Sequence, residues 1–499
     1  MDLSSPYLGF IDLTFTVIHL HSNVDTFEQE HLDYRDTRVR YWDQINADPQ
    51  QTWSSYYRDK ILSAYVQLIS PGARVLELGC GRGDLLAGLE PEYGVGVDFS
   101  AVALEQARLR HPELMFYQLD AHDLSLPDQV FDYIVVSELV NDLWDVQRVL
   151  QSLKPYCAPH TRLVFNFYSH VWNLPLLLGQ RINIATPRLT QNWLAPNDMN
   201  NLLVITGFQP LRSWAEVLVP IKIPGLSNFC NRYLAKLFPF KLFDMVNFAV
   251  ARPAVLPIES QPTVSVIIAA RNESGHIDEL IARVPDMGAH TEIIFVEGHS
   301  TDDTYEAIER AIAANPQRSC KLIRQKGRGK GDAVRDGFDL ATGDILMILD
   351  ADITVPPEDL PRFYDLLEDG SGEFINGVRL VYPMEGNAMR FANLLGNKFF
   401  SWAFSWLLGQ PIRDTLCGTK VLWRRDYLRI AKNRVYFGDF DPFGDFDLLF
   451  GAAKLNLKIL EVPIRYRARR YGETNISRWK HGWLLLRMVA FAARRIKFV

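Results

Sequence analysis

The feature that most limits the possible folds is a run of five apolar residues, 345–349, followed by Asp350-Ala351-Asp352. Five consecutive apolar residues predict a buried strand, and the two carboxylates follow where that strand ends. In an open α/β sheet, ligands bind just beyond the carboxyl ends of the strands. Two acids one residue apart at such an edge can bind a hard divalent cation, which can hold a diphosphate. In isolation, the same motif could also be a solvated turn.

The length of the chain, 499 residues, predicts two or three domains, because single hydrophobic cores stop growing well below that size. Its net charge of −6 gives no global reason to expect a nucleic-acid partner. The five cysteines are scattered without a CxxC pair, which favours a reducing compartment over a disulfide framework or a zinc site.

Targeting and membrane segments are not predicted. The first 21 residues contain an apolar patch but no Lys or Arg, so they lack the positive region of a secretory signal. No window reaches the roughly 18 consecutive apolar residues of a membrane-spanning helix. We therefore expect a cytoplasmic protein.

A glycine-rich loop organises the first half of the chain. The apolar residues 75–78 predict a strand that runs into Gly79, Gly81 and Gly83 and then into a helix. Glycines at these positions allow positive φ angles and let a ligand approach the backbone closely. Later strands are predicted at residues 95–97, 116–119 and 130–136.

Two of these strands end in an acid. Asp98 follows the glycines by about 20 residues, the spacing at which an acid binds a ribose in such folds, and Asp120 ends the next strand. Strands that alternate with helices predict a parallel, doubly wound sheet. The apolar runs 202–208 and 243–251 are predicted to be the strands that complete it.

The pattern Glu77-x-Gly79-x-Gly81-x-Gly83, with Asp98 and Asp120, resembles the class I S-adenosylmethionine-dependent methyltransferases. This resemblance implies a Rossmann-like fold in which the glycines pack against the methionine part of S-adenosylmethionine, Asp98 binds the ribose, and Asp120 borders the adenine. The cofactor-binding residues that it implies are Glu77, Gly79, Gly81, Gly83, Asp98, Asp120 and Ala121. The alternative is a methyltransferase-like fold that has lost its cofactor.

The catalytic residue of the methyl transfer is open, because transfer from a sulfonium needs mainly positioning of the nucleophile and no fixed motif. His122 and Glu138 follow two of the predicted strands and could act as bases. The alternative is that each supports its neighbours or lies at the surface. The methyl acceptor does not follow from these residues.

A proline-rich segment divides the chain. Residues 251–262 contain three prolines and show no periodic pattern, which is typical of a domain linker. The predicted organisation is a methyltransferase domain over residues 1–252, a linker over 253–262 and a second domain over 263–499.

The second domain begins with a new series of strands and polar loops. Strands are predicted at residues 264–270, 292–296 and 321–324. The first runs into Arg271-Asn272-Glu273 and the second into Glu297, while Lys326 and Lys330 lie in a loop with alternating glycines. Such a loop suits phosphate binding, although a solvated basic loop has the same composition.

This order of motifs resembles the family-2 glycosyltransferases of GT-A fold, which bind nucleotide sugars. The resemblance implies that Asp350 and Asp352 hold Mg²⁺ or Mn²⁺ on the diphosphate. The nucleotide-sugar-binding residues that it implies are Arg271, Glu273, Glu297, Lys326, Lys330 and Asp350. The second motif is Glu297-Gly298-His299-Ser300 where the commoner form is Asp-Asp-Gly-Ser, and this leaves the base open.

An acceptor loop and a base are expected further along the chain. Residues 413–420 form a polar loop of the kind that lines an acceptor pocket. Inverting transfer to a hydroxyl needs a general base. The resemblance implies Asp445 for this role, with Asp447 as the second choice. An ionised phosphate acceptor needs no strong base, in which case either acid could be a helix-terminus residue.

The C-terminal end is basic and aromatic. Residues 465–499 contain ten Lys or Arg and one acid, together with tyrosines and tryptophans. This composition suits an anionic interface, although a helix packed on the domain core would also explain it. The resemblance extends to polyprenyl-phosphate glycosyltransferases and implies that Arg465, Arg467 and Arg469 bind the acceptor phosphate. It also implies peripheral contact with the inner face of a membrane.

The sequence therefore predicts a bifunctional enzyme. One half would transfer a sugar from a nucleotide sugar to a polyprenyl phosphate or membrane-linked glycan. The other would transfer a methyl group from S-adenosylmethionine to a related glycan or lipid. The alternative is a glycosyltransferase whose methyltransferase-like half is a degenerate binding or regulatory module.

Overall fold

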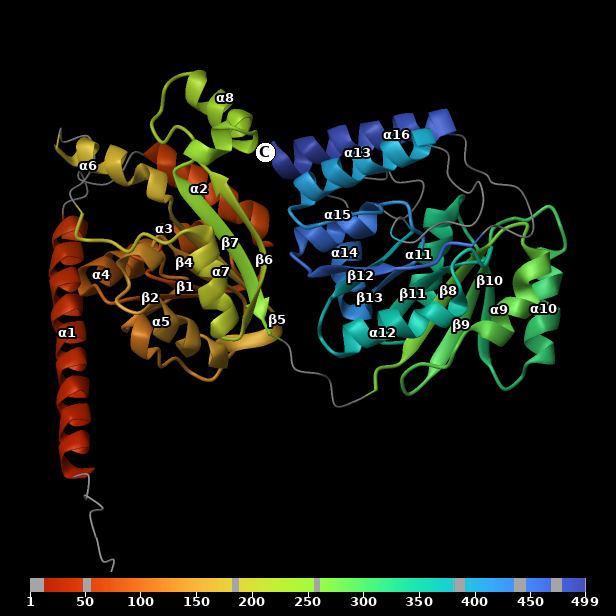
Figure 1. The fold of residues 1–499 in the computed structure, drawn as a ribbon, viewed down its shortest axis with the longest axis horizontal. Helices are drawn as coiled ribbons and strands as arrows, with labels where there is room; N and C mark the ends of the chain where they lie inside the picture. Colours follow the sequence, from red (N-terminus) through yellow and green to blue (C-terminus); the bar gives the residue numbers. More distant parts are fainter. Residues whose placement is uncertain are drawn as a thin grey trace, which may run out of the picture. The chain divides into compact units, whose positions relative to one another are not determined.

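The computed structural model describes residues 13–47, 55–181, 188–254, 261–379, 381, 391–434, 446–467 and 478–498. Within these residues there are two seven-stranded sheets, each with helices packed around it (Figure 1). The chain divides into two compact units, one comprising Met1–Leu202 with Pro220–Lys222 and the other Leu203–Val219 with Ile223–Val499. The predicted α/β class with two doubly wound sheets is confirmed.

The first sheet is built from β1 (Arg74–Leu78), β2 (Tyr93–Asp98), β3 (Met115–Gln118), β4 (Phe131–Ser137), β5 (Cys157–Tyr168), β6 (Phe208–Glu216) and β7 (Val246–Pro253). Their order is β3-β2-β1-β4-β5-β7-β6. Strands β1 to β5 pair in parallel, whereas β6 and β7 are antiparallel to each other. The order reverses between β1 and β4, so a ligand site is expected beyond the carboxyl ends of these two strands.

The helices of the first half are α1 (Leu13–Ala47), α2 (Ser55–Leu68), α3 (Asp84–Gly88), α4 (Ala101–Arg110), α5 (Val146–Ser152), α6 (Asn173–Arg181), α7 (Pro196–Ile205) and α8 (Leu226–Arg232). The prediction of a strand over residues 202–208 is wrong, because α7 continues to Ile205. Pro196 opens that helix, and the Asp198 carboxylate accepts a 2.9 Å hydrogen bond from Ala195 N. The strand predicted at 243–251 is confirmed by β7.

The second sheet is built from β8 (Val264–Ala270), β9 (Thr291–Glu297), β10 (Ser319–Arg324), β11 (Ile345–Asp350), β12 (Phe374–Val378), β13 (Lys420–Trp423) and β14 (Ile459–Pro463). Their order is β10-β9-β8-β11-β13-β12-β14. Strands β8 to β11 are parallel, and β13 runs antiparallel to both of its neighbours. Here the order reverses between β8 and β11, whose register pairs Asp350 with Ala269.

The helices of the second half are α9 (Ile277–Arg283), α10 (Thr304–Ala314), α11 (Lys330–Leu340), α12 (Leu360–Glu368), α13 (Phe391–Leu408), α14 (Arg424–Lys432), α15 (Phe446–Lys454) and α16 (Arg478–Ala492). Apolar side chains fill a separate core on each face of the sheet. Consecutive residues of β11 therefore belong to different cores, Met347 to one and Ile348 to the other. Such two-sided burial explains the continuous apolar run of this strand.

Helices α13 and α16 lie side by side (Figure 1) and pack on one of these cores through Phe404 and Met488. Among the helices that the structure describes, none combines the length and the apolarity needed to cross a membrane. The first sheet ends at Pro253 and the second begins at Val264. Residues 255–260 lie outside the described residues, so the linker and domain boundaries stay predictions.

Candidate functional site

A cavity of about 690 Å³ lies beyond the carboxyl ends of β1 and β4. This volume is typical of small-molecule and cofactor sites. Five of the seven predicted cofactor residues line it: Glu77, Gly79, Gly81, Asp98 and Ala121. Gly83 and Asp120 are not part of its lining. The sequence therefore located the cavity, although not every side chain of its wall.

The glycine loop is held in place by the acid at the end of β2. The Asp98 carboxylate accepts hydrogen bonds of 2.8 Å from Gly81 N and from Ser100 N. Gly81 has φ of 51°, a backbone angle that favours glycine. Burial raises the pKa of Asp98, although these two hydrogen bonds oppose the rise. Asp98 therefore shapes the loop in addition to the ribose role predicted for it.

Glu77 gives the cavity a buried acid. Its side chain is buried, and its Oε2 atom has no hydrogen-bond partner among the described residues. Burial raises the pKa of this carboxyl well above its ordinary value. An unsatisfied buried acceptor is costly unless a ligand satisfies it. A ligand that donates a hydrogen bond to Oε2 would satisfy this wall.

Helices α1 and α2 supply the opposite wall, which sequence reasoning missed. Tyr41 and Trp42 of α1 and Tyr57 of α2 all line the cavity. The Trp42 indole donates a 2.6 Å hydrogen bond to Asp142, which also lines it. No local motif marks these aromatic residues, because their role depends on how the helices pack.

Glu138, one of the two predicted base candidates, also lines the cavity and has a φ of 56°. Such an angle is strained for a residue other than glycine, and strained residues cluster at functional sites. The Tyr57 hydroxyl donates a hydrogen bond to the Glu138 carboxylate. His122, the other candidate, is not part of the lining.

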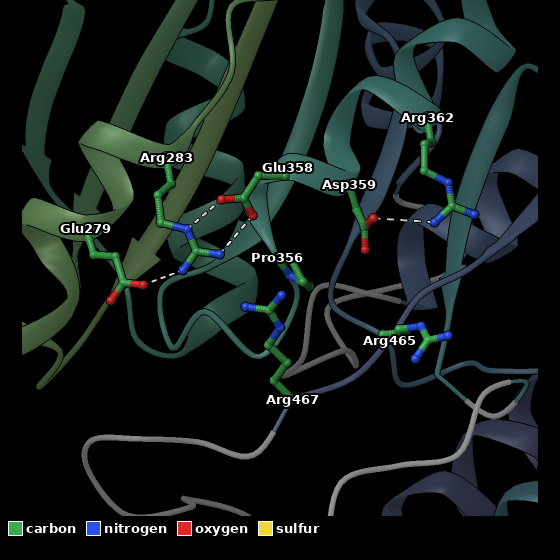
Figure 2. A pocket seen from close by; sticks show the side chains of 8 residues that line it. All are labelled: Glu279, Arg283, Pro356, Glu358, Asp359, Arg362, Arg465 and Arg467. Atoms are coloured by element: carbon green, nitrogen blue, oxygen red, sulfur yellow. Dashed lines mark hydrogen bonds and ion pairs between the residues drawn. The ribbon is translucent and has the colours of Figure 1, made fainter.

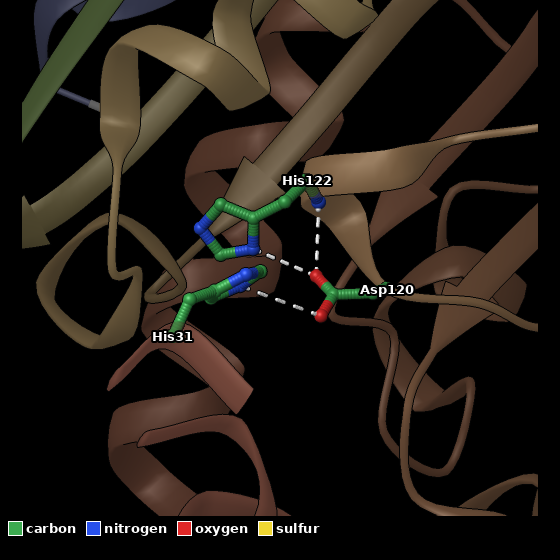
Figure 3. Close-up of side chains that lie close together, drawn as sticks. All are labelled: His31, Asp120 and His122. Atoms are coloured by element: carbon green, nitrogen blue, oxygen red, sulfur yellow. Dashed lines mark hydrogen bonds and ion pairs between the residues drawn. The ribbon is translucent and has the colours of Figure 1, made fainter. Parts of the chain in front are cut away.

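His122 instead forms a buried cluster with His31 and Asp120 (Figure 3). Asp120 accepts a 2.7 Å hydrogen bond from His122 Nδ1 and lies 3.8 Å from His31 Nε2. Asp145 N donates to His122 Nε2 at 3.1 Å, which assigns the ring proton to Nδ1. That nitrogen has no lone pair for a metal in this tautomer, so the geometry favours a hydrogen-bonded group over a metal centre. The adenine contact of Asp120 stays a prediction.

The second candidate site lies beyond the carboxyl ends of β8 and β11. Lys330, the first residue of α11, reaches Asp350 at the end of β11, with 2.5 Å between Nζ and Oδ1. Burial favours the protonated acid, but Lys330, with Lys420 and Arg379, outweighs it and lowers the pKa of Asp350. The carboxylate is therefore ionised at neutral pH.

Gly418 lets the side chains of Asp350 and Lys330 lie close against its backbone. A Cβ atom at this glycine would lie 2.2 Å from Asp350 Oδ2 and 2.3 Å from Lys330 Nζ. The predicted polar loop, 413–420, therefore closes on the acid that ends β11. An ionised carboxylate at this edge of the sheet fits a hard cation with oxygen ligands.

Asp352 is positioned by the turn that follows β11. Its Oδ1 accepts hydrogen bonds from Thr354 N at 3.1 Å and from Thr354 Oγ1 at 2.7 Å. The two acids of the motif are thus held by different groups: Lys330 holds Asp350, and the turn at Thr354 holds Asp352. Their role as metal ligands stays a prediction.

The remaining predicted nucleotide-sugar residues surround the same edge of the sheet. Glu273 and Glu297 are buried, whereas Arg271 and Lys326 are exposed. Glu297 Oε1 accepts a 2.5 Å hydrogen bond from Ser300 N, and Glu273 Oε2 lies 3.0 Å from His276 Nδ1. Both acids therefore also stabilise the loops on which they lie.

Asp447 lies in the first turn of α15, close to two arginines. The distance from its Oδ2 to the guanidinium of Arg335 is 3.2 Å, and that to Arg434 is 3.3 Å. Burial raises the pKa of Asp447, although both arginines oppose the rise. These ion pairs favour a structural role. Asp445 lies outside the described residues, so its role as a base stays a prediction.

Arg465 and Arg467 line a cavity of about 610 Å³, which we call the arginine pocket (Figure 2). Arg283 of α9 and Arg362 of α12 line it too, and sequence reasoning missed both. Its other lining residues are Glu279, Pro356, Glu358 and Asp359. Arg469, the third predicted phosphate ligand, lies outside the described residues.

Arg379, which follows the strand predicted to face the site and for which no role was predicted, lies near Asp350. It forms a two-pronged ion pair with Asp414, with hydrogen bonds of 2.7 Å to Oδ2 and 2.9 Å to Oδ1. Burial opposes ionisation of Asp414, but Arg379 outweighs it and lowers the pKa of that carboxyl. The pair fixes the loop that carries Gly418. Arg379 follows a strand with no motif of its own, so only the fold reveals it.

Two family descriptions match the sequence. The family described as "Methyltransferase domain" matches residues 75–160, and the family described as "Glycosyl transferase family 2" matches residues 265–430. The dolichyl-phosphate hexose transferase of Haloferax volcanii is 30% identical over 221 residues, which are 44% of this chain and 88% of that enzyme. The dolichol-phosphate mannosyltransferase of Pyrococcus furiosus is 34% identical over 225 residues, 43% of this chain and 59% of that enzyme.

Solved structures align with parts of the chain at low sequence identity. A chain from the complex between the Haloferax volcanii Trm112 methyltransferase activator and a methyltransferase has 18% sequence identity and a TM-score of 0.34. The alignment covers 42% of this chain and 97% of that one. Through its second half the chain belongs to glycosyl transferase family 2, and its first half contains a methyltransferase domain.

Proposed function

We propose that the protein transfers a sugar from a nucleotide sugar to a polyprenyl phosphate or a membrane-linked glycan, and that it also transfers a methyl group from S-adenosylmethionine. The observation that carries the first activity is the ionised Asp350 beside Lys330, with both side chains close against the backbone of Gly418. This arrangement lies at the reversal of strand order, where nucleotides bind in open α/β sheets.

Asp350 and Asp352 would hold Mg²⁺ or Mn²⁺, which neutralises the charge that develops on the diphosphate leaving group. Lys330, which pairs with Asp350, would contact the diphosphate that the cation holds. Glu273 and Glu297 lie on the neighbouring loops and would contact the nucleoside. Arg271 and Lys326 are exposed and would reach the phosphates.

The relatives support a phosphate acceptor, because two of them are named for dolichyl-phosphate or dolichol-phosphate transfer. A phosphate oxygen is already ionised and can attack the sugar without a strong base. This agrees with the ion pairs of Asp447 to Arg335 and Arg434. Asp445 would be needed as a base only for a hydroxyl acceptor.

The first half would bind S-adenosylmethionine in the cavity of about 690 Å³. This ligand would donate a hydrogen bond to the buried Glu77, and Asp98 would bind its ribose. The sulfonium makes the methyl group electrophilic, so the acceptor needs correct positioning and loss of a proton. The Glu138 carboxylate, which accepts a hydrogen bond from the Tyr57 hydroxyl, is the base proposed to take this proton. A glycan or lipid related to the sugar acceptor is the proposed methyl acceptor.

A peripheral position at the inner face of a membrane is also proposed. Trp402 of α13 is 68% exposed and Trp483 of α16 is 66% exposed, although both helices also pack on the core. Exposed tryptophans and basic residues suit an interface with anionic lipids. Arg465, Arg467 and Arg469 would then meet the acceptor phosphate.

A panel of nucleotide sugars tested for thermal stabilisation in the presence of Mn²⁺ would identify the donor, because a ligand of the folded state raises its stability. Asp350→Asn should abolish the shift. Asp365→Asn, an exposed acid on α12, is the matched control and should retain it. A shift that survives Asp350→Asn or needs no divalent cation would contradict the metal site.

A further inference from the structure

Four guanidinium groups from three separate segments meet in the arginine pocket (Figure 2). Arg283 comes from the end of α9, Arg362 from α12, and Arg465 and Arg467 from the segment after β14. Guanidinium groups repel one another, so their convergence in one cavity requires compensating negative charge. That charge can come from the protein or from a ligand.

Three carboxylates of the pocket supply part of this charge. Glu358 accepts a two-pronged contact from Arg283, at 2.6 Å from Nε and 2.8 Å from a terminal nitrogen. Glu279 also pairs with Arg283, so this one arginine takes up two of the three acids. Asp359 lies 3.4 Å from Arg362. The three acids of the pocket therefore pair with Arg283 and Arg362.

Another arginine of the pocket, Arg467, pairs with none of these three acids. No hydrogen bond or ion pair joins the Arg467 guanidinium to another side chain among the described residues, and Figure 2 shows it without such a contact. The pKa of Glu358 is lowered mainly by its hydrogen bonds with Arg283, and Arg467 adds a smaller effect. Arg467 therefore remains available to a second anion.

The backbone of Arg467 holds this side chain beside the proposed metal site. Its N–H donates a 3.0 Å hydrogen bond to the carbonyl of Thr354, and Thr354 in turn bonds Asp352. The arginine pocket and Asp352 thus share one short turn. Neither Asp350 nor Lys330 lines the pocket, so it is distinct from the site at Asp350, Lys330 and Gly418.

We propose that the arginine pocket is a phosphate-binding site in which Arg467 and Arg362 contact the ligand and Arg283 is held in position by Glu279 and Glu358. Guanidinium groups match phosphate oxygens in geometry and form strong, charge-assisted hydrogen bonds with them. The ligand is a phosphate group, carried either by a lipid or by a soluble molecule. This site deepens the proposed function and rests on it only for the identity of that carrier.

The test uses the full chain, without divalent cations or nucleotide sugar, titrated calorimetrically with inorganic phosphate at constant ionic strength. Saturable binding is expected for the wild type. Arg467→Gln and Arg362→Gln should each weaken it at least about tenfold, the size expected on loss of a charge-assisted hydrogen bond. The control is Arg310→Gln, which alters an exposed arginine paired with Asp303 and should bind as the wild type does.

Arg467→Gln breaks no ion pair among the described residues, so the variant should keep its wild-type unfolding temperature without phosphate. Absence of saturable binding to the wild type, or equal binding by Arg467→Gln, would overturn the proposal. Asp350→Asn, which targets the proposed metal site, should bind phosphate normally. If it does not, the phosphate occupies that site and the arginine pocket is refuted, independently of the proposed sugar transfer.

A second arm identifies the carrier. Flotation is measured with phosphatidylcholine vesicles that contain or lack phosphatidic acid. Recruitment of the wild type, but not of Arg467→Gln, by phosphatidic acid would support the site with a lipid headgroup as its ligand. Binding of inorganic phosphate without recruitment would support the site with a soluble ligand. Equal recruitment of both proteins would show that other residues bind the lipid and would contradict the role of Arg467.

Discussion

Gly418→Ala is a stringent test of the proposed sugar-transfer site, because the substitution adds a single methyl group. The new Cβ would lie 2.2 Å from Asp350 Oδ2 and 2.3 Å from Lys330 Nζ, whereas ordinary contacts are 3.4–4 Å. Both side chains must therefore move by about 1 Å. A metal site tolerates changes of only roughly 0.2 Å in its ligand distances.

The expected result is a loss of about 100-fold in Mn²⁺-dependent affinity for the nucleotide sugar, or about 2.8 kcal/mol at 1.4 kcal/mol per tenfold. The atoms displaced are the ends of flexible side chains, so the cost in folding free energy should be about 1–3 kcal/mol, typical of overpacking. The protein should remain folded at 25 °C.

Isothermal titration with the nucleotide sugar and Mn²⁺ measures the affinity, and urea unfolding measures the stability. Gly396→Ala in α13 is the matched control, because its Cβ would have no atom within 4 Å. Wild-type affinity in Gly418→Ala, with the fold intact, would refute the reasoning that the cation depends on the position of Asp350 against Gly418.

Three other perturbations test separate parts of the structure. Burial, with a contribution from Glu216, raises the pKa of Asp244 to about 8, so the folded chain binds this proton more tightly than the unfolded chain does. The free energy of unfolding should therefore fall as the pH rises from about 4 to about 8. Asp244→Asn removes this titrating group, so it should flatten the pH dependence. At pH 7.5 it should stabilise the protein by about 1–3 kcal/mol, as measured by urea unfolding. Arg379→Ala should cost about 3–5 kcal/mol in the same assay, because it leaves the buried Asp414 carboxylate unpaired; a loss below 1 kcal/mol would contradict that pairing. Asp98→Asn should weaken binding of S-adenosylmethionine at least about tenfold by calorimetry, because it alters the proposed ribose contact and the hydrogen bond from Gly81 N. The control Asp128→Asn, at an exposed position, should bind as the wild type does.

Much of the fold followed from local sequence patterns. Five apolar residues before Asp350 predicted β11, and the glycines after residue 78 predicted the loop that lines the cavity. The strand predicted at 202–208 failed because apolar runs of this length suit a helix as well as a strand. Pro196 and Asp198 are typical of a helix start, and they favour the helix α7 that the structure shows.

The missed site residues depend on contacts between distant parts of the chain. Arg283 and Arg362 lie on different helices, and neither belongs to a motif, yet both line the arginine pocket. Trp42 lines the other cavity because α1 packs against the first half of the chain. Side-chain position at such sites is set by tertiary packing, which periodicity and spacing do not specify.

The central claim is that one chain contains two separate ligand sites. It is tested most directly by titrating the full chain calorimetrically with S-adenosylmethionine and with a nucleotide sugar plus Mn²⁺. We predict that the wild type binds both, that Asp98→Asn weakens only the first, and that Asp350→Asn abolishes only the second. Absence of S-adenosylmethionine binding to the wild type, or loss of both ligands in either variant, would contradict the claim.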